Sequence, residues 1–498
     1  MTRRAGILDL VLPPRTRGEP AQRWLYESVR SAILGGRVRP GARLPATRDL
    51  AQQHGLARGT VVAAFAQLRA EGYVQSTVGS GTFVGPVPPD VLLGVGRAPD
   101  GAGRAPHALR IVPSRFGRRV RAFPVLEARR TRAFRTDLPA MELFPTTLWA
   151  QVTGRVLRRA STRLLLGSEP LGHPPLREAI AAHLRAARGA RCEPDQIAVV
   201  SGVQEALDLA ARLLVDPGDR VALEDPGYGG AARAFSAVGA RLVPVSVDAE
   251  GLTVDRRRLA GVRLVYTTPA HQYPLGVTMS VARRIDLLRW ARASGAVLFE
   301  DDYDGEYRYQ GRPIPALQGL EPDAPVLLAG SFGKVLFPGL RLGYLVLPEP
   351  LVERVAALRS ATVRHPPVVD QAVLAAFIEE GHLGRHVRRM REIYAERRGV
   401  LYEEVRHELG ELLELSPVEA GLQTAGLLAP GLQAADVVRG AAAEDVEVTE
   451  LGREWRGRFR REGLQLGFSA VPAEEIRRGV RVLAGVLPRL RRGDGGPG

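Results

Sequence analysis

The sequence predicts an α/β protein that joins a small, mostly helical N-terminal part to a large part built around a mostly parallel sheet. After residue 145, short apolar β-prone runs alternate with amphipathic helical stripes, which is typical of parallel strands covered by helices on both faces. Residues 20–86 instead show closely spaced helical stripes followed by two short β-prone runs. A chain of 498 residues rarely forms one core, so we expect separate folded units.

The composition excludes several classes of protein. With 45% apolar residues the chain can bury large cores, and no apolar run reaches membrane-spanning length. The single cysteine, Cys192, excludes an internal disulfide framework and a cysteine-clustered metal site. We therefore expect a cytoplasmic protein with no bound metal and no membrane partner. The net charge of +15 suits a polyanion such as nucleic acid, although a general arginine bias gives the same sum.

The N-terminal part is predicted to contain three helices and a wing. Helical stripes predict the first helix over residues 24–34 and the third over 58–70. Between them, a short helix is expected from Thr47, as its N-cap, to about residue 55. The second and third helices have the proportions of a helix-turn-helix. Two β-prone runs flank residues 77–80, and they predict a two-stranded wing that follows the third helix.

This segment resembles the GntR-type winged helix, a DNA-binding domain. The family pattern of Leu-Pro, Arg, Leu-Ala, Ser-Arg-x-Thr-Val, Leu, Glu-Gly-Tyr and Gly-Ser-Gly-Thr-Phe-Val is nearly all present across residues 20–85, with Ala57 where many relatives have Ser or Thr. The resemblance implies that a domain at 20–86 binds double-stranded operator DNA. It places the contacts at Arg48, at Arg58 and Thr60 on the recognition helix, and at the wing residue Gly79. Without the motif, each arginine is equally well a solvated surface charge.

Residues 87–136 are predicted to form a linker. They are rich in Pro, Gly, Ala and Arg and show little hydrophobic periodicity. Their arginines either contact DNA phosphates or, more simply, form a solvated basic tether.

The large part, residues 137–490, contains seven predicted strands. Because the carboxyl ends of parallel strands collect ligands, polar residues that follow these strands are candidates for a site. The predicted strands are Ile197–Val200, Arg220–Leu223, Arg241–Val245, Arg263–Thr267, Ala296–Phe299, Val326–Ala329 and Gly343–Val346.

One of these positions holds Lys334, the only lysine of the chain. Arginine binds carboxylates and phosphates through its planar fork, but it stays protonated, whereas lysine can lose its proton and condense with an aldehyde. A sole lysine can also be a remnant of an arginine-rich composition. Its neighbours Ser331 and Arg341 argue against this, because a hydroxyl and a guanidinium can hold a phosphate beside a Schiff base.

Three other strand ends supply matching groups. After the first strand, Gly202, Val203 and Gln204 open a helix whose free N–H groups can bind a phosphate. Tyr228 follows the second strand and can stack on a planar ring. Asp301 and Tyr303 offer a partner for a protonated ring nitrogen and a phenol donor. Each has an ordinary explanation, but with Lys334 they form the set that pyridoxal 5'-phosphate requires.

The order and the residues of these motifs resemble those of the MocR/GabR branch of the GntR regulators. That branch fuses a winged helix to a class I aminotransferase-like domain of fold type I, a PLP-dependent transferase-like fold with a smaller C-terminal α+β subdomain. The carrying segments are Glu224–Tyr228, Thr268–Gly276, Glu300–Asp304 and Ser331–Tyr344.

The resemblance also implies a role for each residue of the set. Lys334 is the catalytic residue and forms the internal aldimine. Asp301 holds the ring nitrogen, Tyr303 donates to the phenolic oxygen and Tyr228 stacks on the ring. The phosphate is held by Ser331, Arg341 and the turn of Gly202, Val203 and Gln204.

Several positions depart from the family pattern. A usual Tyr-Gly-Asp-Pro stretch is replaced by Gly167–Pro170, which removes an aromatic residue. Val203 and Gly333 each replace a hydroxyl residue, and Gln423 replaces a histidine. The arginine that would bind an effector carboxylate has no clear position, and Arg453, Arg456, Arg458 and Arg460 are candidates by region only.

Three functions fit these features. The first is a PLP-dependent transcription regulator that senses a small amine, an amino acid or PLP itself and changes its DNA affinity. The second is an active aminotransferase that carries a DNA-binding domain. The third is a regulator whose large domain has lost the cofactor and only dimerises. The sole lysine argues against the third, and the departures and the DNA-binding part argue against the second. By resemblance the protein is a homodimer that reads two half-sites.

Overall fold

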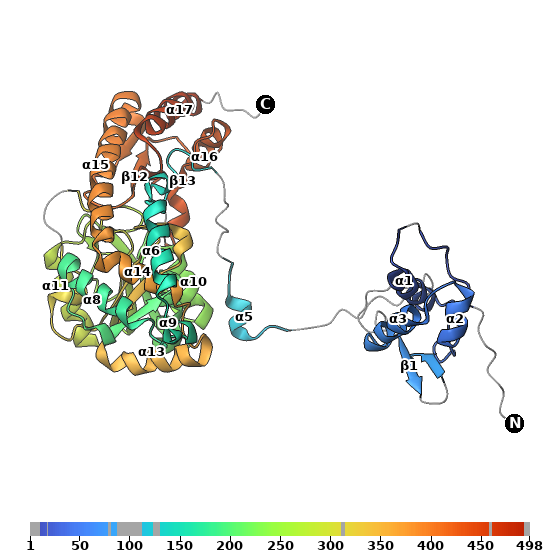
Figure 1. The fold of residues 1–498 in the computed structure, drawn as a ribbon. Coiled ribbons are helices and arrows are strands. Elements are labelled where there is room, and N and C mark those ends of the chain that lie inside the picture. The colour runs from blue at the N-terminus through green and yellow to red at the C-terminus, as the bar shows by residue number, and fades with distance from the viewer. Residues whose placement is uncertain are drawn as a thin grey trace. The chain divides into compact units, whose positions relative to one another are not determined.

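The computed structural model describes residues 10–16, 18–77, 81–86, 112–122, 130–309, 314–457 and 461–492. The chain divides into two compact units, Met1–Ile111 and Val112–Gly498 (Figure 1). Each unit has a core of its own.

The first unit is a three-helix domain with a β-hairpin. Its helices α1 and α3 pack together around a core that includes Leu25, Val61 and Leu68, and the hairpin strands pair antiparallel. One local expectation was wrong: Ala46, in extended conformation, is the N-cap of α2, so Thr47 is already helical and does not cap it. The elements are α1 (Ala21–Leu34), α2 (Thr47–Gln53), α3 (Arg58–Ala70), β1 (Val74–Thr77) and β2 (Gly81–Val84).

The predicted linker, 87–136, is too long at its C-terminal end. Phe134 is fully buried in the main core of the second unit, and its backbone pairs with Gly467. A short helix, α5 (Arg115–Arg119), also belongs to the second unit. Composition hid the contact of Phe134, because Gly467 lies more than 300 residues further along the chain.

An eight-stranded sheet forms the centre of the second unit. Its order is β3-β10-β9-β8-β7-β4-β5-β6. Strands β4, β5, β7, β8 and β9 pair in parallel, whereas β10 is antiparallel to both β3 and β9, and β6 is antiparallel to β5. All seven predicted strands form. Their bounds are β3 (Ile197–Val200), β4 (Arg220–Asp225), β5 (Arg241–Asp248), β6 (Gly251–Leu252), β7 (Val262–Thr267), β8 (Val297–Asp302), β9 (Val326–Ser331) and β10 (Gly343–Val346).

Helices cover both faces of this sheet. Alternate residues of one strand enter different cores: Val199 packs with α8 and α14, while Ala198 and Val200 pack with α9, α10 and α13. Helix α11 packs on β4, β5, β7, β8 and β9 through a further cluster around Leu298. The helices of this part of the unit are α6 (Thr146–Arg158), α7 (Thr162–Leu166), α8 (Pro174–Arg188), α9 (Val203–Leu214), α10 (Gly229–Val238), α11 (Val281–Ser294), α12 (Leu317–Leu320), α13 (Glu349–Thr362) and α14 (Val369–Glu379).

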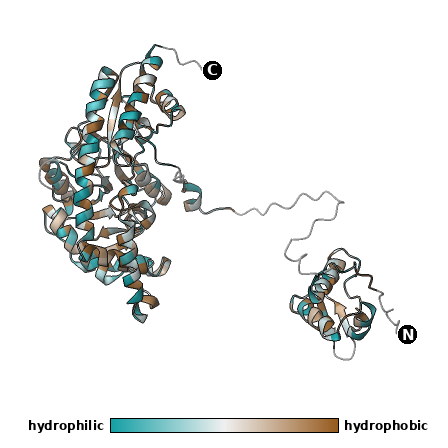
Figure 2. Ribbon diagram, turned by 45° about the horizontal axis from the view of Figure 1, so that its top comes forward, coloured by the Kyte–Doolittle hydropathy of each residue, from teal (hydrophilic) through white to brown (hydrophobic). Residues whose placement is uncertain are grey.

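A smaller α+β subdomain completes the unit. Four antiparallel strands in the order β11-β12-β14-β13 share the main core with the long helix α15 and with α17. Along the helices, hydrophobic and hydrophilic residues alternate in stripes (Figure 2). None of the helices in the described ranges combines the length and the apolarity needed to cross a bilayer. The elements are α15 (His382–Glu408), β11 (Leu413–Leu415), β12 (Gln423–Leu428), α16 (Ala434–Ala443), β13 (Thr449–Glu450), β14 (Gly463–Gly467) and α17 (Ala473–Arg491).

Candidate functional site

The candidate residues of the large unit lie at one edge of the sheet. Because β4, β7, β8 and β9 are parallel, their carboxyl ends meet at the same edge. Tyr228 follows β4, the segment 268–276 follows β7, Asp301 and Tyr303 stand at the end of β8, and Lys334 follows β9. This shared edge is what brings together residues more than 100 positions apart.

Lys334 is held by Asp137, which lies 197 positions earlier in the sequence. Its Nζ donates to the backbone carbonyl of Asp137 at 2.8 Å and lies 3.1 Å from Oδ1 of the same residue. The lysine side chain keeps 26% of its surface exposed. Asp137 adopts a left-handed backbone conformation with φ 66°. The amine is therefore held at the site edge and remains accessible.

Asp301 is buried with one oxygen paired and one available. Its Oδ2 accepts a hydrogen bond of 2.7 Å from the Tyr266 hydroxyl. Among the described residues, its Oδ1 has no hydrogen-bond partner. Burial raises the pKa of Asp301 to about 7, although the Tyr266 hydrogen bond and the charge of Lys334 oppose the rise. A protonated ring nitrogen would both satisfy Oδ1 and favour the ionised form.

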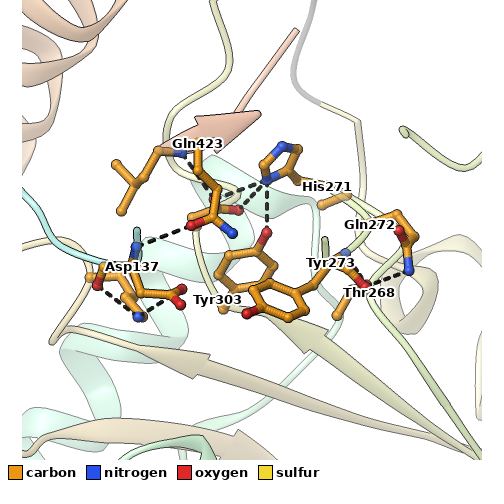
Figure 3. A network of polar contacts seen from close by, with 12 residues as sticks. Asp137, Thr268, His271, Gln272, Tyr273, Tyr303 and Gln423 are labelled. Carbon is orange, nitrogen blue, oxygen red and sulfur yellow. Dashed lines mark hydrogen bonds and ion pairs between the residues drawn. The ribbon is translucent and has the colours of Figure 1, made fainter. Parts of the chain in front are cut away.

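Tyr303 contacts His271, which lies within the segment Thr268–Gly276. Its hydroxyl lies 2.9 Å from Nδ1 of His271, and the same nitrogen lies 3.0 Å from Oδ2 of Asp304 (Figure 3). Burial raises the pKa of Tyr303 well above its ordinary value, so the phenol keeps its proton. Asp304 and His271 thus fix the position of the Tyr303 hydroxyl.

Tyrosine rings line the space between these groups. Tyr273 contacts Tyr228 edge to face, with centroids 5.7 Å apart, and contacts Tyr303 in the same manner at 6.0 Å. A Cβ at Gly230 would come within 2.4 Å of the Tyr228 ring and 2.6 Å of Gln204 Oε1. Glycine at this position is therefore what lets Tyr228 lie where it does.

The expected phosphate-holding residues lie around the start of α9. Gly202, with φ 101°, is the residue before the helix, and a Cβ there would lie 3.8 Å from both terminal nitrogens of Arg341. Val203 is the first helical residue and offers its backbone N–H only. Gln204 Nε2 donates to the carbonyl of Gly230 at 3.3 Å. Ser331 Oγ accepts from the backbone N–H of Gly333 at 3.1 Å.

The candidate carboxylate-binding arginines are either engaged elsewhere or outside the described residues. Arg456 donates to the carbonyls of Gly227 at 3.0 Å and Tyr228 at 3.4 Å. Arg453 is 62% exposed and pairs with Glu450 at 3.4 Å. Arg458 and Arg460 lie outside the described residues.

In the first unit, the expected DNA-contacting residues stand on the two helices of the helix-turn-helix. Arg48 is exposed on α2, Arg58 is exposed at the first position of α3, and Thr60 is half-buried two residues later. Ala57, the N-cap of α3, makes no side-chain capping bond. Gly79 lies outside the described residues.

Sequence reasoning missed four residues of the site. His271 and Tyr273 follow a strand end, as Tyr228 does, so the same rule applied to that segment would have found them. Tyr266 lies inside strand β7. Asp137 carries no signal at all in the sequence.

Two family models match the chain. Residues 142–447 match "Aminotransferase class I and II", and residues 21–84 match "Bacterial regulatory proteins, gntR family". The chain is 38% identical over 465 residues to "Probable rhizopine catabolism regulatory protein MocR" of Rhizobium meliloti, covering 93% of each chain. It is 33% identical to "HTH-type pyridoxine biosynthesis transcriptional regulator PdxR" of Corynebacterium glutamicum, covering 91% of this chain and 93% of that one.

Solved structures match the large unit. A multiple substrate aminotransferase from Thermococcus profundus superposes with a TM-score of 0.67 at 28% identity, over 72% of this chain and 92% of that one. The alpha-aminoadipate aminotransferase LysN of Thermus thermophilus, solved with N-(5'-phosphopyridoxyl)-L-leucine, gives 0.66 at 29% identity, over 72% and 92%. These matches confirm the predicted fold class. The chain belongs to the MocR-type branch of the GntR family of transcription regulators, in which a GntR winged helix is joined to an aminotransferase class I and II domain.

Proposed function

We propose that this regulator binds pyridoxal 5'-phosphate at Lys334 and responds to a small amine, an amino acid or PLP by changing its affinity for operator DNA. The observation that carries the proposal is Asp301, a buried carboxylate whose Oδ1 is unpaired among the described residues, at the same sheet edge as the only lysine. The solved relative LysN, whose structure holds N-(5'-phosphopyridoxyl)-L-leucine, supports the choice of cofactor.

The residues present fit this group. The cofactor supplies an aldehyde that reacts with amines and a ring that accepts electron density. Asp301 Oδ1 would accept from the ring nitrogen, Tyr303 would donate to the phenolic oxygen, and Tyr228 would lie against the ring. Arg341, Ser331 and the N–H groups of Gly202, Val203 and Gln204 would hold the phosphate at the N-terminus of α9.

Regulation requires that the effector bind two conformations with different free energy. We propose that an effector amine competes for the position of the Lys334 amine and thereby alters the contact with Asp137. A homodimer of this chain in the cytoplasm would present two winged helices to two half-sites, with Arg48, Arg58, Thr60 and Gly79 at the DNA.

A working aminotransferase is the second candidate, because Lys334 and Asp301 are both present and the structural neighbours are named as aminotransferases. In that case Lys334 would move the α-proton of the substrate. Many turnovers with a panel of amino acids and keto acids would favour this reading, and a single half-reaction at most would favour the regulator.

The absorption spectrum of the purified full-length protein with added PLP tests the proposal. Wild type should show a visible band that borohydride abolishes, and Lys334→Ala should show none. Because the chain has one lysine, peptide mapping after borohydride should find the mass increase on the peptide of Lys334 alone. A band of equal strength in Lys334→Ala, or no band in either protein, would contradict the proposal.

A further inference from the structure

Two glutamine side chains of the C-terminal subdomain are buried with unpaired amide atoms. Gln465 is 0% exposed and Gln423 is 1% exposed. Within the described ranges, neither amide atom of Gln465 has a hydrogen-bond partner, and neither does Nε2 of Gln423. A buried polar atom without a partner costs free energy, so the partner of such an atom has to come from a water molecule or from a ligand.

Both glutamines project from the same face of the four-stranded sheet. Ala425 of β12 lies directly opposite Gln465 of β14, and Gln423 lies opposite Gly467. Opposed residues of an antiparallel pair project to one face, and so do residues two apart in one strand. Gln423 and Gln465 are therefore diagonal neighbours.

This face is turned toward Lys334. The Oε1 of Gln423 accepts from the backbone N–H of Asp137 at 3.1 Å, and the carbonyl of Asp137 accepts from Lys334 Nζ at 2.8 Å. Figure 3 shows Gln423 between Asp137 and the pair of Tyr303 and His271. Gln465 lies close enough to the Tyr273 hydroxyl to oppose the rise of the tyrosine pKa that burial causes. Gln423 thus lies one residue away from the reactive amine, through Asp137, and Gln465 lies beside Gln423 on the same sheet face.

Among the described residues, the charges near Tyr273 disfavour a carboxylate ligand. Asp137 and Glu454 both act electrostatically on Tyr273. The guanidinium of Arg456 already donates to backbone carbonyls. A Cβ at Gly229 would lie within 4 Å of side-chain atoms of Arg233, Glu454 and Arg456. The carboxylate of Glu454 therefore lies near both guanidinium groups and offsets their positive charge.

On the basis of the proposed function, we propose that Gln423 and Gln465 form the recognition subsite for the distal end of the effector. The effector is then a primary amine whose distal group is neutral and both donates and accepts hydrogen bonds, such as a hydroxyl or a carboxamide. Such a group pairs with the Nε2 donors and with the Oε1 acceptor of Gln465. A carboxylate only accepts, and it would leave that acceptor unpaired.

Four primary amines of similar length test this subsite on the full-length, PLP-loaded protein. They are 3-aminopropanol, β-alaninamide, β-alanine and propylamine. Each is titrated while the visible absorption and the anisotropy of labelled operator DNA are followed. We expect 3-aminopropanol and β-alaninamide to change the absorption and the anisotropy at concentrations about tenfold lower than β-alanine and propylamine require. The reason is that only the first two can pair with both the donor and the acceptor atoms of the buried amides.

Variants distinguish recognition of the amine by Gln465 from a non-specific effect of replacing a glutamine in this subdomain. Gln465→Leu should abolish the preference for the polar amines, and Gln465→Arg should shift it toward β-alanine by about tenfold. The matched control is Gln433→Leu, which removes an exposed glutamine at the start of α16 in the same subdomain and should keep the wild-type order.

The outcomes distinguish this inference from the proposed function. If wild type shows the visible band but prefers β-alanine, responds to none of the amines, or keeps its preference in Gln465→Leu, the subsite assignment is wrong while the cofactor assignment stands. If wild type shows no visible band, the cofactor assignment fails and the subsite fails with it.

Discussion

The hydroxyl of Tyr266 donates a hydrogen bond of 2.7 Å to Oδ2 of Asp301, across two neighbouring parallel strands. The bond holds one carboxylate oxygen, while Oδ1 has no partner among the described residues, and it lowers the pKa that burial has raised. Tyr266 itself is 1% exposed and its hydroxyl has a strongly raised pKa, so it acts as a donor throughout the working pH range. Tyr266 is thus a positioning residue for Asp301.

Replacing Tyr266 by Phe should weaken cofactor binding. Loss of the donor raises the pKa of Asp301 further, so less carboxylate is available to a protonated ring nitrogen at neutral pH. Because a hydrogen bond to a charged group is worth about 1.5–3 kcal/mol, PLP affinity at pH 7 should fall roughly tenfold or more. Titration of the visible band between pH 6.5 and 9 measures this. Tyr26→Phe, in the first unit, is the control, and equal affinity of Tyr266→Phe and wild type would remove Tyr266 from the site.

Replacing Asp301 by Asn should change how the stability of the cofactor-free protein depends on pH. The folded pKa is about 7, above the ordinary value of 3.8. Between these values the unfolded chain has lost the proton that the folded chain keeps, so wild-type stability falls as pH rises. The Asn variant does not undergo this loss. Between pH 5 and pH 8 its free energy of unfolding should therefore rise relative to that of wild type by on the order of 1–3 kcal/mol. Melting temperatures across this range test it, with the exposed Asp208→Asn as control; a difference that is constant with pH would contradict it.

Replacing Gly230 by Ala should disturb the aromatic wall. The new Cβ would come within 2.4 Å of the Tyr228 ring and 2.6 Å of Gln204 Oε1, so the ring must move. We expect weaker PLP binding by about tenfold with little loss of secondary structure, measured by absorption and circular dichroism. Gly399→Ala, in α15, has nothing within 4 Å of its Cβ and serves as the matched control. A variant with wild-type affinity would show that Tyr228 does not need its present position.

Replacing Arg58 by Ala should weaken operator binding. The side chain is exposed at the start of α3, where a recognition helix meets the groove. We expect about 1–3 kcal/mol of lost affinity for the promoter upstream of the chain's own gene. Arg69→Ala, exposed in the last turn of the same helix, should have a much smaller effect. If the two variants bind equally across a salt series, the recognition helix has been assigned to the wrong end or the wrong element.

Local features of this protein follow from its sequence alone. Hydrophobic stripes and turns place three helices and a hairpin in the first unit, because each depends on neighbours within a few residues. The seven strands follow from apolar runs between helices, and parallel pairing then brings their ends to one edge. That edge predicts the neighbourhood of Lys334, Asp301, Tyr303 and Tyr228. The chemistry of a sole lysine needs no structure to be noticed.

Tertiary structure alone decided which groups complete the site. Asp137 reaches Lys334 across 197 residues, and Gln423 reaches Asp137 across 286. The burial of Phe134 under the small sheet and the shared face of Gln423 and Gln465 depend on strands that pair far apart in the chain. No periodicity encodes such contacts, because they arise from the packing of the subdomain against the sheet edge. Local propensity sets the elements of this protein, and long-range packing selects the polar atoms that face the site.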